Sequence, residues 1–219
     1  MTCSERRACA LRAQVNLDGY ALPIKKLKGT EPVESLDLSH KGLGVASAIV
    51  IASLIGVNGG LTKISLAGNI LEEEGTKAIC EALEQNTTLK ELDISGHREY
   101  SNIGGSAGAK HVAKMVRVNG ALTSVKLGGN KLGDEGWGAI FAAICGNKDS
   151  KIMCLDASSE TIGPAGVKLI AEALRTSATG ALTECNLRNN SSMGEAVQAS
   201  IRNAVHMAVQ GKAWFTLRL

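Results

Sequence analysis

Aromatic side chains are scarce in this sequence, since only 3 % of its 219 residues are Phe, Trp or Tyr. The chain is long enough for a large core, which must therefore consist mainly of Leu, Ile, Val and Ala. The sequence also lacks any run of 18 apolar residues and any apolar N-terminal stretch of signal-peptide length. These absences predict neither a membrane-spanning helix nor export. We expect a protein of the cytoplasm or, alternatively, of the nucleus.

Patterns that carry enzyme chemistry are missing as well. The six cysteines show no CxxC or metal-type spacing, so we expect reduced thiols, and the four histidines lack zinc-type spacing. No G-x-S-x-G elbow is present, and the run Gly104-Gly105-Ser106-Ala107-Gly108 lacks the lysine of a P-loop. We therefore expect no catalytic, cofactor or metal site. The net charge of +3 is too small to argue for a nucleic-acid or membrane partner.

What the sequence does contain is a repeat. LTKISLAGNILEEEG begins at Leu61, and LTSVKLGGNKLGDEG begins at Leu122. The pattern L-x-x-L-x-L-x-x-N-x-L is matched six times, with spacings of 28, 28, 33, 30 and 30 residues between copies that open at Val33, Leu61, Leu89, Leu122, Ile152 and Leu182. Degenerate copies precede them in RAQVNLDGYAL and follow them in WFTLRL. Eight strands are therefore predicted, six of them from clear copies of the pattern.

Each copy predicts a strand, a turn and a helix. The phrases L-T-K-I-S-L and L-T-S-V-K-L alternate apolar and polar residues, as a half-buried strand does. Asn69 and Asn130 follow in the turn, where they can bond open backbone groups. A 3.6-residue apolar period then predicts a helix, with Asp134-Glu135 and Pro164 as start signals and Asn58-Gly59 as a stop signal.

The period, the phrases SLAGNILEEEG and KLGGNKLGDEG and the long helix resemble leucine-rich repeats of the ribonuclease-inhibitor type. The resemblance covers residues 12–219 and implies a right-handed αβ solenoid, a curved horseshoe segment with a parallel sheet on the concave side and helices on the convex side. Residues 1–219 then form a single domain, in which 1–32 are a degenerate N-terminal capping repeat, 33–209 are six repeats and 210–219 are a terminal strand.

In such a fold, repeat positions three, five and seven are displayed on the concave side. They carry six acidic and four basic residues, a balance of −2 that disfavours nucleic acid. The face is either a plain solvated surface or a protein-binding surface. In the second case the partner-binding candidates are Asp37, Lys63, Glu91, Asp93, Lys126, Asp156 and Glu184.

The repeat that opens at Leu89 is longer because GHREYSNIGG replaces a short turn. Arg98 and Tyr100 are then candidates for contact with a partner at the rim, because insertions in repeat proteins often lie on the binding face. A neutral surface insertion is the alternative.

Trp137 and Phe141 lie four residues apart and so share one helix face. The equivalent positions in other repeats suggest partial exposure on the convex side, which would make the two residues a self-association patch; packing onto the adjacent helix is the alternative. Trp214, in the last strand, is a third candidate for a homodimer contact, because an open strand edge invites pairing.

The sequence thus favours a non-catalytic scaffold that binds a protein partner through the concave sheet or the rim insertion. One alternative is a regulatory protein, because repeats of this type resemble those of the GTPase-activating family that acts on Ran. Another is a structural module that assembles with itself.

Overall fold

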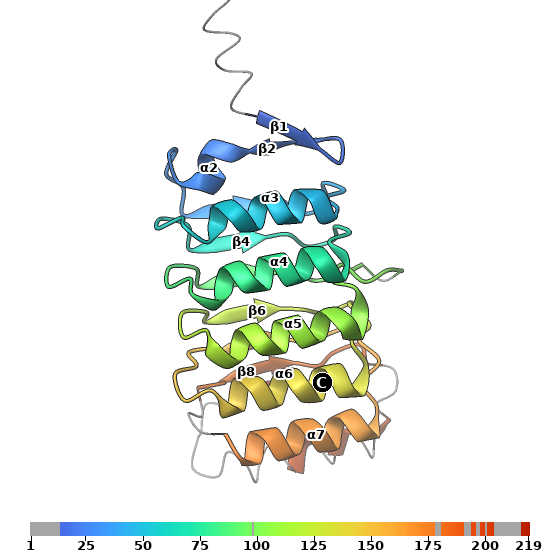
Figure 1. Ribbon diagram of the computed structural model, residues 1–219. Helices are drawn as coiled ribbons and strands as arrows, with labels where there is room; N and C mark the ends of the chain where they lie inside the picture. Colours follow the sequence, from blue (N-terminus) through green and yellow to red (C-terminus); the bar gives the residue numbers. More distant parts are fainter. Residues whose placement is uncertain are drawn as a thin grey trace, which may run out of the picture.

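The computed structural model describes residues 14–97, 99–177, 181–190, 194–195, 198–199, 201–203 and 216–219. Over these residues, strands alternate with helices, and the strand–helix units stack in chain order along the molecule (Figure 1). The strands form a parallel sheet and the helices cover one of its faces, which confirms the predicted αβ solenoid. Every helix in the described part is too short or too polar to cross a bilayer.

Each regular unit begins with a three-residue strand, and in the first five units a helix of three to four turns follows. The first units comprise β3 (Ser35–Asp37), α3 (Val45–Ile55), β4 (Lys63–Ser65), α4 (Glu72–Glu84), β5 (Glu91–Asp93) and α5 (Gly105–Val118). The later ones comprise β6 (Ser124–Lys126), α6 (Gly133–Gly146), β7 (Cys154–Asp156), α7 (Pro164–Arg175), β8 (Glu184–Asn186) and β9 (Thr216–Arg218). Pro164 begins α7 and the acidic pair Asp134-Glu135 lies in the first turn of α6, as the start signals predict.

The sheet keeps one register along its whole length. Its seven described strands pair in the order β3-β4-β5-β6-β7-β8-β9, all parallel, and each strand centre lies opposite the next. Leu92 of β5 pairs with Val125 of β6 even though the repeat between them has 33 residues. Variation in repeat length is therefore absorbed outside the sheet.

The core lies between the sheet and the helices. In β3 to β8 the central residue is buried while its two neighbours are exposed or half-exposed, which is the predicted alternation. Ile64 and Val125 are 0 % exposed, and they pack with apolar helix residues such as Ile79 and Ile140 in one continuous apolar cluster. A single unit could not bury these side chains, so neighbouring units complete each other's core.

Of the two alternatives for Trp137 and Phe141, the structure agrees with packing in the helix layer and not with exposure on the convex side. Both side chains are 0 % exposed, and their rings pack against each other with centroids 6.2 Å apart. They belong to α6, which contacts α5 on one side and α7 on the other. Both side chains belong to the continuous apolar core, so they offer no exposed surface for self-association. Trp214, the third candidate, lies outside the described residues.

The predicted first repeat is also corrected. Gln14–Leu17 (β1) and Tyr20–Pro23 (β2) form an antiparallel hairpin with Asp18 and Gly19 in its turn, and Ile24–Lys28 (α2) follows. The hairpin is a sheet of its own, so the strand at Val15 does not join the parallel sheet, and Asp18 does not lie on the concave side. Leu22 and Leu27 are buried and cover the apolar end of the stack.

Buried asparagines connect neighbouring units at the turns. Asn69 is 0 % exposed; its side-chain Nδ2 donates to Leu38 O at 2.9 Å and its Oδ1 accepts from Leu43 N at 3.0 Å, both in the preceding unit. Asn130 is likewise 0 % exposed and donates to Ile94 O at 2.9 Å. These contacts confirm the predicted bonding of open backbone groups.

Candidate functional site

The sheet face turned away from the helices displays the first and third residue of each strand. This surface, called the sheet face below, carries most of the predicted partner-binding candidates: Asp37, Lys63, Glu91, Asp93, Lys126, Asp156 and Glu184. All seven are exposed or half-exposed. The structure therefore brings together, on one surface, residues that are up to 147 positions apart in the chain (Asp37 to Glu184).

Ion pairs between adjacent or nearby strands order this surface. Lys63 Nζ lies 2.8 Å from Glu91 Oε2, and the two residues face each other in the register of β4 and β5. The hydrogen bond to Glu91 and the charge of that residue raise the pKa of the Lys63 ammonium. Opposite charges directly across a strand pair favour one another, so the register holds these long side chains in defined positions.

Two more pairs use the remaining cations of the strands. Lys126 Nζ is 3.6 Å from Asp93 Oδ2, and Arg218 Nη2 is 2.7 Å from Glu184 Oε1. The described strands thus hold three basic and five acidic residues on the sheet face, and each basic residue is paired. A net charge of −2 remains, carried by Asp37 and Asp156.

Hydrogen bonds from a serine two positions later hold these two carboxylates. Asp37 Oδ1 accepts from Ser39 N at 2.9 Å and from Ser39 Oγ at 2.6 Å, which lowers the pKa of the Asp37 carboxyl. Asp156 Oδ1 accepts from Ser158 N at 2.9 Å and from Asn186 Nδ2 at 3.0 Å. Among the described residues, neither carboxylate has a Lys or Arg nitrogen within 4.0 Å.

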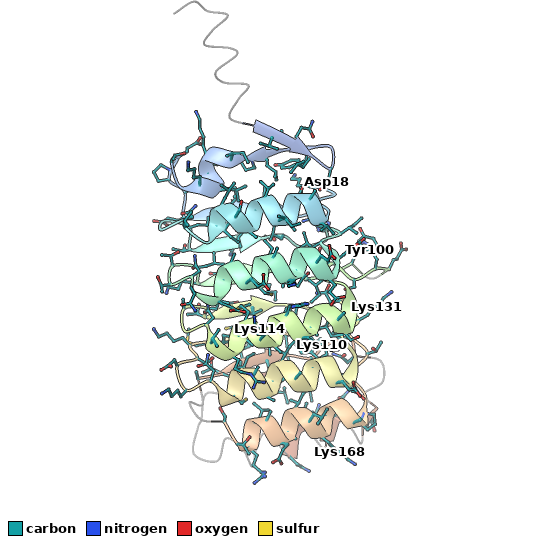
Figure 2. All side chains as sticks on the ribbon, viewed as in Figure 1. Asp18, Tyr100, Lys110, Lys114, Lys131 and Lys168 are labelled. Carbon is teal, nitrogen blue, oxygen red and sulfur yellow. The ribbon has the colours of Figure 1, made fainter. Side chains whose placement is uncertain are left out.

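The insertion after β5 is a closed loop tied to the next repeat. The rings of His97 and Tyr100 stack with centroids 5.1 Å apart, and His97 N donates to Tyr100 O at 3.1 Å. Lys131 Nζ donates to Glu99 O at 2.6 Å from the following unit. Tyr100 remains 41 % exposed, and Figure 2 shows it near Lys131 at one edge of the stack. These contacts hold the backbone beside the exposed Tyr100 ring. Arg98, the other predicted contact, lies outside the described residues.

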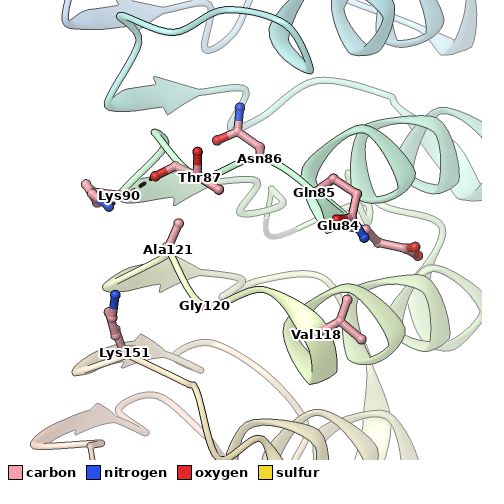
Figure 3. A pocket seen from close by; sticks show the side chains of 9 residues that line it. All are labelled: Glu84, Gln85, Asn86, Thr87, Lys90, Val118, Gly120, Ala121 and Lys151. Atoms are coloured by element: carbon pink, nitrogen blue, oxygen red, sulfur yellow. Dashed lines mark hydrogen bonds between the residues drawn. The ribbon is translucent and has the colours of Figure 1, made fainter.

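A hollow of about 300 Å³ opens at the opposite edge, where helices lead into strands. Figure 3 shows Lys90 and Lys151 near the strand ends of this hollow, with Glu84 and Val118 near the helix ends. Its buried polar side chain, Asn86, already donates to Ile55 O and accepts from Leu89 N. Within the described residues, the hollow therefore has no buried polar group left to orient a ligand.

A family model for the leucine-rich repeat matches residues 85–98 and 121–141, two stretches that contain β5 and β6, and the second also includes the first part of α6. The chain is also 31 % identical over 112 residues to NACHT, LRR and PYD domains-containing protein 5 of Bos taurus, a match that covers 51 % of this chain and 10 % of that protein. Together with the stacked units, these matches show leucine-rich repeats of the ribonuclease-inhibitor-like type.

Other leucine-rich-repeat proteins match over similar lengths. RAN GTPase-activating protein 2 of Arabidopsis thaliana is 27 % identical over 121 residues, which are 54 % of this chain and 21 % of that protein. The solved structure of Leiomodin-1 Actin-Binding Site 2 superposes with a TM-score of 0.54 at 17 % identity, covering 87 % of this chain and 89 % of that one. The structural match supports the fold. The chain spans about a tenth of the length of NACHT, LRR and PYD domains-containing protein 5 and about a fifth of the length of RAN GTPase-activating protein 2.

One buried residue that connects the turns of neighbouring repeats was not predicted. Glu160 takes the place that Asn69 and Asn130 hold in their repeats, is 2 % exposed, and accepts from the backbone N–H groups of Lys131 and Leu132. Burial raises the pKa of its carboxyl, while the Leu132 and Asn130 N–H groups partly offset this effect. The signal was its alignment with the repeat asparagine, in the phrase SSETIG, where a carboxylate oxygen can accept the same bonds.

Proposed function

We propose that this chain is a non-catalytic interaction module that binds another protein through its sheet face, with the insertion around Tyr100 as a second contact. The observation that carries the proposal is the paired charge pattern of the sheet face. Its ion pairs fix long side chains before a partner arrives, so less conformational entropy is lost on binding. Charge patterns of this kind select partners by complementarity.

The relatives support the same function class. The leiomodin-1 structure is that of an actin-binding site, and the fold of that chain is shared here. The paired charges do not gather in a cleft, and the surplus of −2 on the sheet face opposes binding of a phosphate backbone. The compartment follows the sequence in this proposal: the chain is cytoplasmic or nuclear, and its partner is a protein.

The test compares two variants with equal changes of charge. Lys63→Glu with Lys126→Glu alters the sheet face, whereas Lys110→Glu with Lys168→Glu alters exposed lysines on the helix side, where Figure 2 shows them. Each tagged protein is used to capture partners from a cell extract, and captured proteins are quantified by mass spectrometry. Thermal unfolding followed by circular dichroism shows whether both variants are folded.

We expect the sheet-face variant to capture about tenfold less of the partner than wild type does, because the reversed charges oppose the complementary surface of the partner. The helix-side variant should retain it. If instead the helix-side variant loses the partner and the sheet-face variant keeps it, the binding surface is on the convex side and the proposal is wrong.

A regulatory role is the second candidate, and the similarity to RAN GTPase-activating protein 2 favours it. It predicts that catalytic amounts of the chain accelerate GTP hydrolysis by purified Ran. Phosphate release at unchanged rate would remove this candidate and leave the binding role in place.

A further inference from the structure

A second hollow lies at the C-terminal ends of β5, β6 and β7, beside the sheet face. Its volume is about 220 Å³, and its walls include Asp156 with Ser95 and Ser158. This is below the roughly 300–1,000 Å³ of sites that hold drug-sized ligands, so the hollow suits one side chain rather than a whole small molecule.

Glycines line this hollow because neighbouring backbones approach each other closely there. At the seventh repeat position β5 is followed by Ser95 and β7 by Ser158, but β6 is followed by Gly128. A Cβ atom on Gly128 would lie 2.6 Å from Ser158 O, and one on Gly96 would lie 2.3 Å from Gly129 O. Glycine therefore lets the backbones approach, and their N–H groups are used between repeats, as in the bond from Gly129 N to Ser158 O at 2.9 Å.

The groups that remain available are an anion and hydroxyls. Lys126, the register partner of Asp156 on one side, is ion-paired with Asp93, and Asn186 on the other side is neutral. The bonds from Ser158 N and Asn186 Nδ2 both reach Oδ1 of Asp156, and within the described residues Oδ2 accepts none. A half-buried carboxylate with one oxygen open, beside serine hydroxyls, is complementary to a donor that carries positive charge.

The surroundings of the hollow favour a donor that belongs to a polypeptide. Gly96, which lines the hollow, is directly followed by the insertion that displays Tyr100, and the sheet face continues from Asp156 along β7. A metal ion is disfavoured, because the described part of the chain has no group of three or more His, Cys, Asp or Glu that could hold one.

We propose that the hollow beside Asp156 receives an arginine or lysine side chain of the bound protein. The inference rests on the proposed function and specifies the chemistry of the partner: a basic residue on the segment that lies over the ends of β5 to β7. Asp156 Oδ2 accepts a hydrogen bond from the cationic nitrogen, and the serine hydroxyls accept further ones.

The experiment uses the whole chain with defined probes. ¹⁵N-labelled protein is titrated at low ionic strength with acetylated, amidated hexa-arginine, hexalysine and hexaglutamate, and amide shifts are followed by NMR. Wild type is compared with Asp156→Asn, which keeps the shape of the side chain. Asp37→Asn is the matched control, because Asp37 is the other unpaired carboxylate with the same serine contact but does not line this hollow.

We expect both basic peptides to shift the amides of Gly128, Gly129 and Ser158, and hexaglutamate to leave them unchanged. Asp156→Asn should weaken binding about tenfold, as loss of a charge-assisted hydrogen bond does, and Asp37→Asn less than about twofold. Equal weakening by the two variants, or shifts centred elsewhere, would overturn the inference. Partner capture is scored separately: if the sheet-face charge reversal abolishes capture but Asp156→Asn does not, the proposed function stands and this inference fails.

Discussion

At the residue scale, single buried polar side chains connect one repeat to the next. Asn58, Asn86, Asn119 and Asn147 do this where helices end, and Asn119 is typical: Nδ2 donates to Leu83 O at 2.8 Å, and Oδ1 accepts from Leu122 N at 2.9 Å. Asn69, Asn102 and Asn130 do it where strands end. Each amide satisfies backbone groups of two units that would otherwise be buried without partners.

Asn130→Ala should lower the free energy of unfolding by about 2–4 kcal/mol, because it leaves Ile94 O, Leu127 O and the N–H of Asn102 without this partner. Urea denaturation followed by circular dichroism measures the change. Asn16→Ala, at an exposed asparagine of the hairpin, is the control and should change stability by at most about 0.5 kcal/mol. Equal effects would show that the buried bonds do not hold the stack.

At the element scale, side chains from one repeat cap helices of the next. Asp18, in the β1–β2 turn, accepts from Gly44 N at 2.9 Å and from Ser47 Oγ at 2.5 Å at the start of α3. Asp134 of α6 accepts from Gly163 N at 2.6 Å at the start of α7. A carboxylate there also faces the positive end of the helix dipole. The hairpin is thereby fixed to the first regular repeat.

Asp18→Asn should reduce stability at neutral pH by about 0.5–1 kcal/mol, because it removes this charge but keeps an acceptor oxygen. The Ser47 hydroxyl and the Gly44 N–H lower the pKa of the Asp18 carboxyl below 3.8. The unfolded state therefore binds a proton first as pH falls, so the contribution is complete above 3.8 and disappears as pH falls below it.

Urea denaturation of both proteins between pH 7 and pH 2 tests the prediction for Asp18. The stability difference should shrink toward zero at the acid end. Asp149→Asn, at an exposed aspartate, supplies the control for the general effect of losing one acidic charge. A difference that stays constant over the whole range would mean that Asp18 acts through shape alone.

At the scale of the whole molecule, the core runs through neighbouring units without interruption. Trp137→Ala should therefore lower the free energy of unfolding by about 3–5 kcal/mol, the usual effect of deleting a fully buried ring, and should leave the sedimentation coefficient of the folded protein unchanged. Tyr100→Ala, at the exposed ring of the insertion, should lower the free energy of unfolding by about 0.5 kcal/mol. A change of association state in Trp137→Ala with little loss of stability would contradict the burial of this ring.

The fold was predictable because its signal is repeated: six copies of one pattern place each strand, and alternation at Ile64 or Val125 shows which residues face inward. The positions of Asp37 through Glu184 on one surface follow from that register. The hairpin was not predictable, because Val15, Leu17 and Leu22 fit a parallel strand equally well until Asp18 and Gly19 turn the chain. The burial of Trp137 depends on how closely the neighbouring helices pack, and the roles of Glu160 and the glycine-lined hollow depend on contacts between repeats, which the pattern within one repeat does not contain.

The constant register across the 33-residue repeat has a practical consequence. Asn102 donates to Leu66 O at 2.9 Å. After the insertion it thus makes the same kind of hydrogen bond to the preceding repeat that the turn asparagines of the shorter repeats make. Extra sequence between Gly96 and Ser101 is thus isolated from the strands on either side. A foreign epitope grafted there would be displayed on a rigid support while the lattice of backbone contacts beneath it stays intact, which makes this position an entry point for engineering new affinities.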